Sequence, residues 1–121
     1  MANSKVTVLG TDYEIVVKKY SDDEAFERRS IDGYCDYLLK QIVICDMTTY
    51  KGWENEPVET AKEAQKQTLR HEIVHAFFSE SGLSDSGLSF EGAWCKNEEL
   101  VDWIAWQGPK IHKAWEMANA I

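Results

Sequence analysis

The sequence predicts an α+β fold in one domain that covers residues 1–121. Residues 1–50 contain several short runs of alternating apolar and polar side chains, which is the period of a half-buried β-strand. The remainder contains one long stretch without glycine or proline, which is typical of a helix. With 121 residues, of which 44% are hydrophobic, the chain can bury one modest core.

A small antiparallel sheet of three or four strands is expected at the N-terminal end. Gly10–Asp12 separates two alternating runs and predicts a tight hairpin. Residues 21–30 are polar and indicate either a short helix or a loop. The expected strands are Lys5–Leu9, Tyr13–Lys18, Tyr34–Leu38 and Gln41–Cys45.

Helices are expected after residue 57. Pro57 suits the first turn of a helix, residues 58–81 favour helix throughout, and Gly82 is a typical stop signal. Proline cannot continue the hydrogen-bond ladder of a helix, so Gly108–Pro109 predicts a break. The two helices expected around that break are Ala93 or Asn97 to Gln107 and Ile111–Ala120.

Charge and composition argue against several function classes. The chain has 13 Lys and Arg residues against 21 Asp and Glu residues, and a net charge of −8 makes it a poor ligand for nucleic acid or anionic membranes. No apolar run is long enough to cross a bilayer, and residues 1–8 lack the features of a signal peptide. Three cysteines without a Cys-x-x-Cys pair indicate reduced thiols, so we expect a cytoplasmic protein.

The long predicted helix contains the pattern His-Glu-x-x-His at residues 71–75. His71 and His75 are one helical turn apart, so both imidazoles can reach one Zn²⁺ ion. Glu72 lies about 100° further round the helix, where its carboxylate can reach a water at the metal and act as general base and then acid. The motif therefore predicts a zinc site with Glu72 as the catalytic group.

A third protein ligand is expected on the next helix, because catalytic zinc sites usually have three. Glu98 and Asp102 share one face of that helix. Glu98 would bind the metal, and Asp102 could accept the second N–H of a zinc-bound histidine, with His71 preferred. Glu99 is the main alternative to Glu98. The other candidates left open are Glu80, Asp85, Glu91, Cys95 and His112.

The helical segment from His71 to His75, followed by Glu98, Val101–Asp102 and Ile104–Ala105, resembles the zinc metallopeptidases of the ImmA/IrrE kind. These gluzincin-like proteins are common in phages, prophages and other mobile elements. The resemblance covers residues 69–105, with Val101 in place of the usual alanine. It implies a minimal zincin-like fold, in which the sheet packs on an active-site helix and C-terminal helices, and a zinc-dependent endopeptidase acting on a peptide or protein.

The resemblance also implies features of a substrate site. In related metallopeptidases an edge strand beside the active-site helix pairs with the substrate, and Gln41–Cys45 is the candidate here. A donor to the developing oxyanion is needed, and the candidates are Tyr34, Tyr37, Tyr50 and His112. Trp53 could line a substrate groove. The four tryptophans expected to pack in the core or in an interface are Trp94, Trp103, Trp106 and Trp115.

Two other interpretations are kept. One is a non-catalytic, zinc-stabilised protein-binding module of a mobile element, in which a fourth protein ligand such as Cys95 closes the metal site. The other is a metal-free protein in which the His-Glu-x-x-His pattern is coincidental. The sequence leaves the substrate, the cleavage preference and the oligomeric state open.

Overall fold

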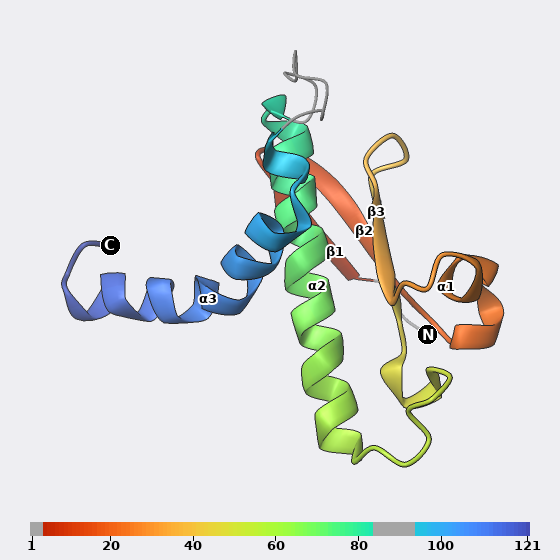
Figure 1. Ribbon diagram of the computed structural model, residues 1–121. Helices are drawn as coiled ribbons and strands as arrows, with labels where there is room; N and C mark the ends of the chain where they lie inside the picture. The colour runs from red at the N-terminus through yellow and green to blue at the C-terminus, as the bar shows by residue number, and fades with distance from the viewer. Residues whose placement is uncertain (1–3, 84–93) are drawn as a thin grey trace.

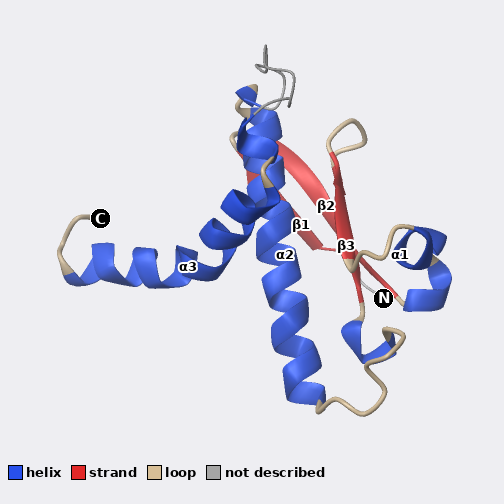
Figure 2. Ribbon diagram, in the orientation of Figure 1, coloured by secondary structure: helices blue, strands red, loops and turns tan. Residues whose placement is uncertain are grey.

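The computed structural model describes residues 4–83 and 94–121 and combines helices with a single sheet (Figure 1). A long helix crosses one face of a four-stranded sheet, as Figure 2 shows with the strands in red. The expected α+β class is confirmed. The strands are β1 (Ser4–Val8), β2 (Thr11–Lys18), β3 (Gly33–Asp36) and β4 (Gln41–Cys45). The helices are α1 (Glu24–Arg28), α2 (Val58–Glu80) and α3 (Glu98–Met117), with short 3₁₀ turns η1 (Tyr20–Asp22), η2 (Met47–Thr49) and η4 (Trp94–Lys96).

The sheet has the order β1-β2-β4-β3 and is mixed. β1 pairs with β2 and β3 pairs with β4 in the antiparallel sense, whereas β2 and β4 run parallel. The prediction of a wholly antiparallel sheet is therefore wrong. The segment that contains η1 and α1 carries the chain from β2 to the far edge, where β3 forms. β4 then returns between β2 and β3 in the same direction as β2.

β4 is the central strand of the core. Ile42 and Ile44 pack with β1, β2 and α2, whereas Val43 and Cys45 pack on the opposite face with Phe26 of α1. The side chains of these four residues of β4 are at most 1% exposed. A continuous apolar run of this kind is typical of a strand that is covered on both faces. The expectation that Gln41–Cys45 forms the edge strand is therefore wrong, and β3 is the edge strand beside α2.

A close contact with Gly33 brings β3 against α2. A Cβ atom at Gly33 would lie 2.8 Å from Cγ2 of Thr68, which is too short for a carbon–carbon contact. Asp32, the residue directly before the strand, contacts the same helix. Its Oδ2 accepts a hydrogen bond from the hydroxyl of Thr68 at 3.0 Å. The absence of a side chain at position 33 thus fixes how closely the edge strand approaches the helix that carries the His-Glu-x-x-His pattern.

α2 confirms the expected long helix, but α3 differs from the prediction. α3 continues through Pro109 to Met117, so the break expected at Gly108–Pro109 is wrong. The helix changes direction along its length and its last turns extend away from the sheet (Figure 1). Because residue 109 has no N–H, the carbonyl of Ala105 lacks its helical donor. Nε of Arg70 on α2 donates to that oxygen instead, at 2.8 Å.

Several large apolar side chains lie at the surface rather than in the core. Phe77 on α2 is 42% exposed. The tryptophans expected to be packed are 52–63% exposed, at positions Trp94, Trp103, Trp106 and Trp115. The prediction that these four tryptophans could pack in the core is therefore wrong. No helix in the described residues is both long enough and apolar enough to cross a membrane.

The bond from Arg70 to α3 can be tested by a double-mutant cycle with Pro109. Arg70→Met leaves the Ala105 carbonyl without a donor, and we expect a loss of about 1–3 kcal/mol in the free energy of unfolding. Pro109→Ala restores the helical N–H, so Arg70→Met should then cost at least about 1 kcal/mol less. Urea unfolding of the four proteins gives the coupling energy. Additive effects would show that Arg70 does not replace the missing donor.

Candidate metal centre

α2 places three functional side chains on the face that meets β3 and α3. His71 and His75 lie one turn apart, with side chains 14% and 23% exposed. Glu72 points toward the sheet side and its side chain is only 8% exposed. The helix is held there by Leu69, Ile73 and Ala76, which pack against the sheet. The histidines therefore sit on a helix whose rotation is fixed by the core.

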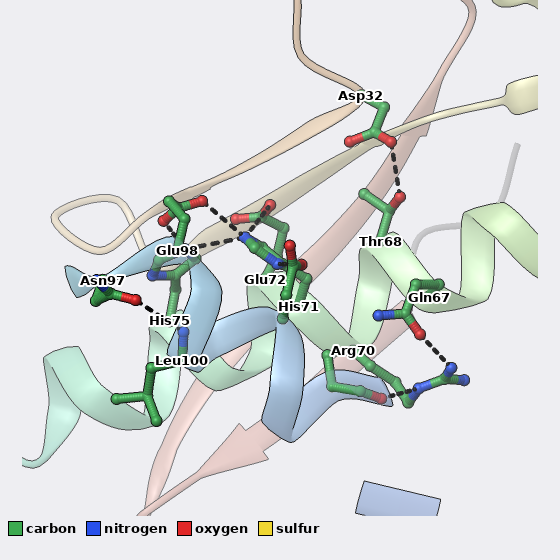
Figure 3. Close-up of polar contacts among 12 residues, drawn as sticks. Asp32, Gln67, Thr68, Arg70, His71, Glu72, His75, Asn97, Glu98 and Leu100 are labelled. Atoms are coloured by element: carbon green, nitrogen blue, oxygen red, sulfur yellow. Dashed lines mark hydrogen bonds and ion pairs between the residues drawn. The ribbon is translucent and has the colours of Figure 1, made fainter. Parts of the chain in front are cut away.

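α3 begins at the point where it can meet these histidines. Oδ1 of Asn97 accepts a hydrogen bond from the Leu100 N–H at 2.9 Å, which caps the helix. Glu98 follows directly, and Asp102 lies one turn further along on the same face. Both carboxylates reach across to His71 on α2, and Figure 3 shows Glu98 beside the two histidines.

Two imidazole nitrogens and one carboxylate converge between the helices. Nε2 of His71 and Nε2 of His75 are 3.2 Å apart. Glu98 places Oε2 at 3.1 Å from Nε2 of His71 and Oε1 at 2.9 Å from Nε2 of His75. Glu72 is further away, with Oε2 at 3.9 Å from Nε2 of His71. The structure thus brings Glu98, rather than Glu99, onto both histidines.

The donor set and its spacing fit a small divalent cation. Zinc binds histidine nitrogen and carboxylate oxygen at about 2.0–2.2 Å, so ligands at the corners of a tetrahedron lie about 3.3–3.6 Å apart. The three separations at His71, His75 and Glu98 are slightly shorter than this. Nitrogen lone pairs and carboxylate oxygens this close require a proton or a cation between them. Nitrogen and oxygen ligands of this kind suit zinc.

Asp102 fixes the orientation of His71. Its Oδ1 lies 2.6 Å from Nδ1 of His71, so the carboxylate accepts the Nδ1 proton and leaves Nε2 directed at Glu98. The contact expected between Asp102 and His71 is present, and its role beside a bound metal stays a prediction. Burial lowers the pKa of His71, but the charges of Glu72, Glu98 and Asp102 outweigh burial and raise it above its usual value. The charge of this site therefore favours a cation.

Glu72 and His75 are shifted by their surroundings. Burial raises the pKa of Glu72 to about 7, opposed by His71 and assisted by the negative charge of Glu98. Burial also lowers the pKa of His75, and the nearby His71 acts in the same direction. His75 therefore favours the neutral form that ligates metals, and a cation at the cluster would favour the ionised form of Glu72.

Two cavities open on either side of the cluster, and both are bordered by Glu72 and Glu98. One cavity is bordered by His75, and we call it the His75-side cavity. It has a volume of about 560 Å³ and runs along β3. The other cavity is bordered by His71, and we call it the His71-side cavity. It has a volume of about 420 Å³ and reaches η2 and Trp53. Trp53 thus lines a cavity, and the prediction that it contacts a substrate there stays a prediction. The edge strand β3 and the cluster of His71, His75 and Glu98 thus share one cleft.

The remaining candidate ligands lie elsewhere. Glu99 is exposed, and Cys95 is buried in η4 at 1% exposure. Glu80 accepts hydrogen bonds from Tyr13 and Lys40 at the far end of α2. His112 lies on the last turns of α3 beside Glu116. Asp85 and Glu91, like the alternative helix start at Ala93, fall outside the described residues.

The four candidates for the oxyanion donor differ in their hydrogen bonds and in the cavity that they border. Tyr34 already donates to Asp23, and Tyr50 donates to the carbonyl of Ile31. His112 lines a different groove, between α2 and α3. Only Tyr37 both borders the cleft and has no hydrogen bond among the described residues. Its side chain is half-exposed.

Sequence reasoning missed two residues that shape the site. Arg70 ties α2 to α3 directly beside His71, and Asp32 borders the cleft from the segment before β3. The only signal for Arg70 was Pro109, which leaves the carbonyl of Ala105 without a helical donor, and Ala105 lies 35 residues after Arg70. Comparison of the chain with family models, with curated proteins and with solved structures finds no match.

The buried carboxyl of Glu72 predicts a pH-dependent stability in metal-free protein. The folded protein keeps the Glu72 proton up to a pKa of about 7, whereas the unfolded chain releases it near the ordinary glutamate pKa of 4.5, so stability falls as pH rises between the two. Glutamine does not ionise, so Glu72→Gln removes this loss of stability at higher pH. The variant should gain up to about 3 kcal/mol over the wild type between about pH 4 and about pH 8, as measured by urea unfolding with a chelator.

The exposed Glu63→Gln on the same helix is the matched control, and its difference from the wild type should stay within about 0.5 kcal/mol at every pH. A Glu72→Gln difference that is equally flat would mean that Glu72 is ionised in the folded, metal-free protein.

Proposed function

We propose that this protein is a zinc-dependent metallopeptidase that hydrolyses peptide bonds in a peptide or protein substrate. The observation that carries the proposal is the convergence of His71, His75 and Glu98 on one point beside the buried Glu72. This is the arrangement that the resemblance to the ImmA/IrrE metallopeptidases implies. The two histidines and Glu98 would hold the metal, with Asp102 orienting His71.

Each residue of this site has a defined task in peptide hydrolysis. When bound, zinc lowers the pKa of a coordinated water and polarises the substrate carbonyl. Glu72 takes a proton from the attacking water and delivers it to the nitrogen of the leaving amine as the C–N bond breaks. The raised pKa of Glu72, about 7, suits a group that must both accept and donate a proton near neutral pH.

The cleft supplies a place for an extended peptide. β3 is an edge strand, and its residues Gly33–Asp36 line the cavity on the His75 side. A substrate strand can hydrogen-bond to such an edge and run past the metal cluster. This assigns to β3 the task that the sequence suggested for Gln41–Cys45. Tyr37, at the end of the strand, is the remaining candidate for a donor to the oxyanion.

An open cleft favours the peptidase over a structural zinc site. A structural site is closed by four protein ligands. Among the described residues, the group of possible metal ligands is His71, Glu72 and His75, joined by Glu98, and Cys95 is not part of it. The Glu98 side chain is 67% exposed, so the site opens to solvent on the side of α3.

Metal affinity should depend on Glu98 and not on its neighbour. Glu98→Ala removes one of three ligands, and we expect zinc affinity to fall by more than about 100-fold, whereas Asp102→Asn should cost about 10- to 100-fold. Glu99→Ala, an exposed carboxylate on the same turn of α3, is the control and should bind zinc as the wild type does. Competition with a chromophoric chelator measures all four proteins. Equal affinities for Glu98→Ala and Glu99→Ala would place the third ligand elsewhere.

Cleavage should require Glu72 while metal binding does not. Glu72→Gln keeps the size of the side chain but cannot accept the proton, so we expect a loss of at least about 10²-fold in cleavage rate with zinc content unchanged. The measurement is mass spectrometry of a proteome-derived peptide library after incubation with each zinc-loaded protein. Peptides cut equally fast by both proteins would remove Glu72 from the mechanism, and a library left intact by the wild type would overturn the peptidase.

A further inference from the structure

The two halves of the cleft differ in charge. Arg29 and Lys96 border the His75-side cavity. The His71-side cavity has no lysine or arginine among the described residues that line it, and its carboxylates outside the metal cluster are Asp32 and Asp102. Asp102 is paired with His71. The negative charge of Asp32 is therefore the one that this cavity offers to a ligand.

Asp32 has an unpaired carboxylate oxygen. Its Oδ2 contacts the hydroxyl of Thr68, and no ion pair or further side-chain hydrogen bond involves Asp32 among the described residues. The negative charge acts on its surroundings. After burial, Asp32 is the strongest influence that raises the pKa of Tyr50, which borders the same cavity. A positive group in the cavity would neutralise this charge.

The walls of the cavity suit a long aliphatic stem with a polar end. Met47, Tyr50 and Trp53 form an apolar and aromatic side of the His71-side cavity. Lysine and arginine side chains pack their methylene stems on such surfaces, and their cations interact favourably with aromatic rings. The cavity volume of about 420 Å³ leaves room for one such side chain.

A second polar group in the same cavity lacks a partner. Nε2 of Gln67 is buried and has no hydrogen-bond acceptor among the described residues. The amide cannot turn freely, because Nη2 of Arg70 donates to Oε1 of Gln67 at 2.6 Å (Figure 3). Buried donors without acceptors are rare in folded proteins. A backbone carbonyl of a bound peptide would satisfy this donor.

We propose that the His71-side cavity is a subsite for a lysine or arginine side chain of the substrate, next to the scissile bond, with Asp32 as the residue that determines this specificity. The position next to the scissile bond rests on the proposed peptidase function, whereas the recognition of a basic side chain rests on the cavity itself. The cation lies at the free oxygen of Asp32, and the stem lies along Met47 and Trp53. The substrate class is therefore a peptide or protein with exposed basic residues, which agrees with the net charge of −8.

Binding of small probes tests the subsite without any cleavage. The probes are the N-acetyl methylamides of arginine, lysine, norleucine and glutamate, titrated into zinc-loaded protein and followed by NMR of the Trp53 indole N–H and the Gln67 side-chain amide. We expect arginine and lysine to bind at least about 10-fold more tightly than norleucine, because a hydrogen bond to a charged group contributes about 1.5–3 kcal/mol. Glutamate should not bind.

Two variants locate the effect. Asp32→Asn keeps the contact with Thr68 but removes the charge, so arginine should bind no more tightly than norleucine. Asp36→Asn is the matched control, because Asp36 borders the other cavity and accepts hydrogen bonds from the N–H groups of Leu38 and Leu39. This variant should bind arginine as the wild type does. Equal binding of arginine and norleucine by the wild type, or unchanged arginine binding by Asp32→Asn, would overturn the subsite.

Cleavage of the peptide library separates this inference from the proposed function. If the protein is a peptidase, lysine and arginine should be enriched at one position beside the cleaved bond, and Asp32→Asn should abolish that enrichment. Cleavage without a basic preference would overturn the subsite and leave the peptidase intact. Binding of the arginine probe that depends on Asp32, together with an uncut library, would support the basic subsite and overturn the peptidase.

Discussion

The convergence of two imidazole nitrogens and a carboxylate between α2 and α3 constrains the rest of the molecule. Groups that accept hydrogen bonds cannot lie about 3 Å apart unless something positive lies between them. The fold holds them there through contacts on both sides of the cluster. Asp102 fixes the ring of His71, and Arg70 ties the next turn of α3 to the same helix. The helices therefore meet at a geometry that favours a cation.

The sheet sets the other wall of the site. β4 is covered on both faces, so it cannot shift without disturbing either half of the core. β3 is paired to β4 and lies close to α2 because position 33 has no side chain. An edge strand, a cluster of possible metal ligands and a buried carboxyl thus come together from three separate stretches of chain. The rigid parts of the fold carry the site, which keeps the distances that the proposed chemistry depends on.

Much of the site follows from helical spacing alone. The positions of His71, His75, Glu98 and Asp102 on two helix faces required only the period of the α-helix. The contact between Asp102 and His71 was expected because a metal-bound histidine usually donates its second N–H to a carboxylate, and the structure contains that contact. The long helix α2 was also predictable, because its residues favour helix locally.

Features that depend on distant partners were not predictable. The parallel pairing of β2 with β4 depends on where the chain crosses, and local alternation carries no information about that. Pro109 looked like a break because its compensating donor, Arg70, lies on another helix. The tryptophans of α3 were expected in the core or in an interface, and they lie outside the core because residue type indicates burial only on average.

The separation of the ligands along the chain also affects how the protein matures. Glu98 lies 27 residues after His71, so the ligand set is complete only when the polypeptide has been synthesised as far as α3 and that helix has docked. A growing chain on the ribosome, or a fragment cut before α3, holds two histidines and no third ligand. Closing such a loop has an entropic cost that only the folded protein recovers. The proposed hydrolytic centre is therefore incomplete, and should be inactive, in chains that end before α3.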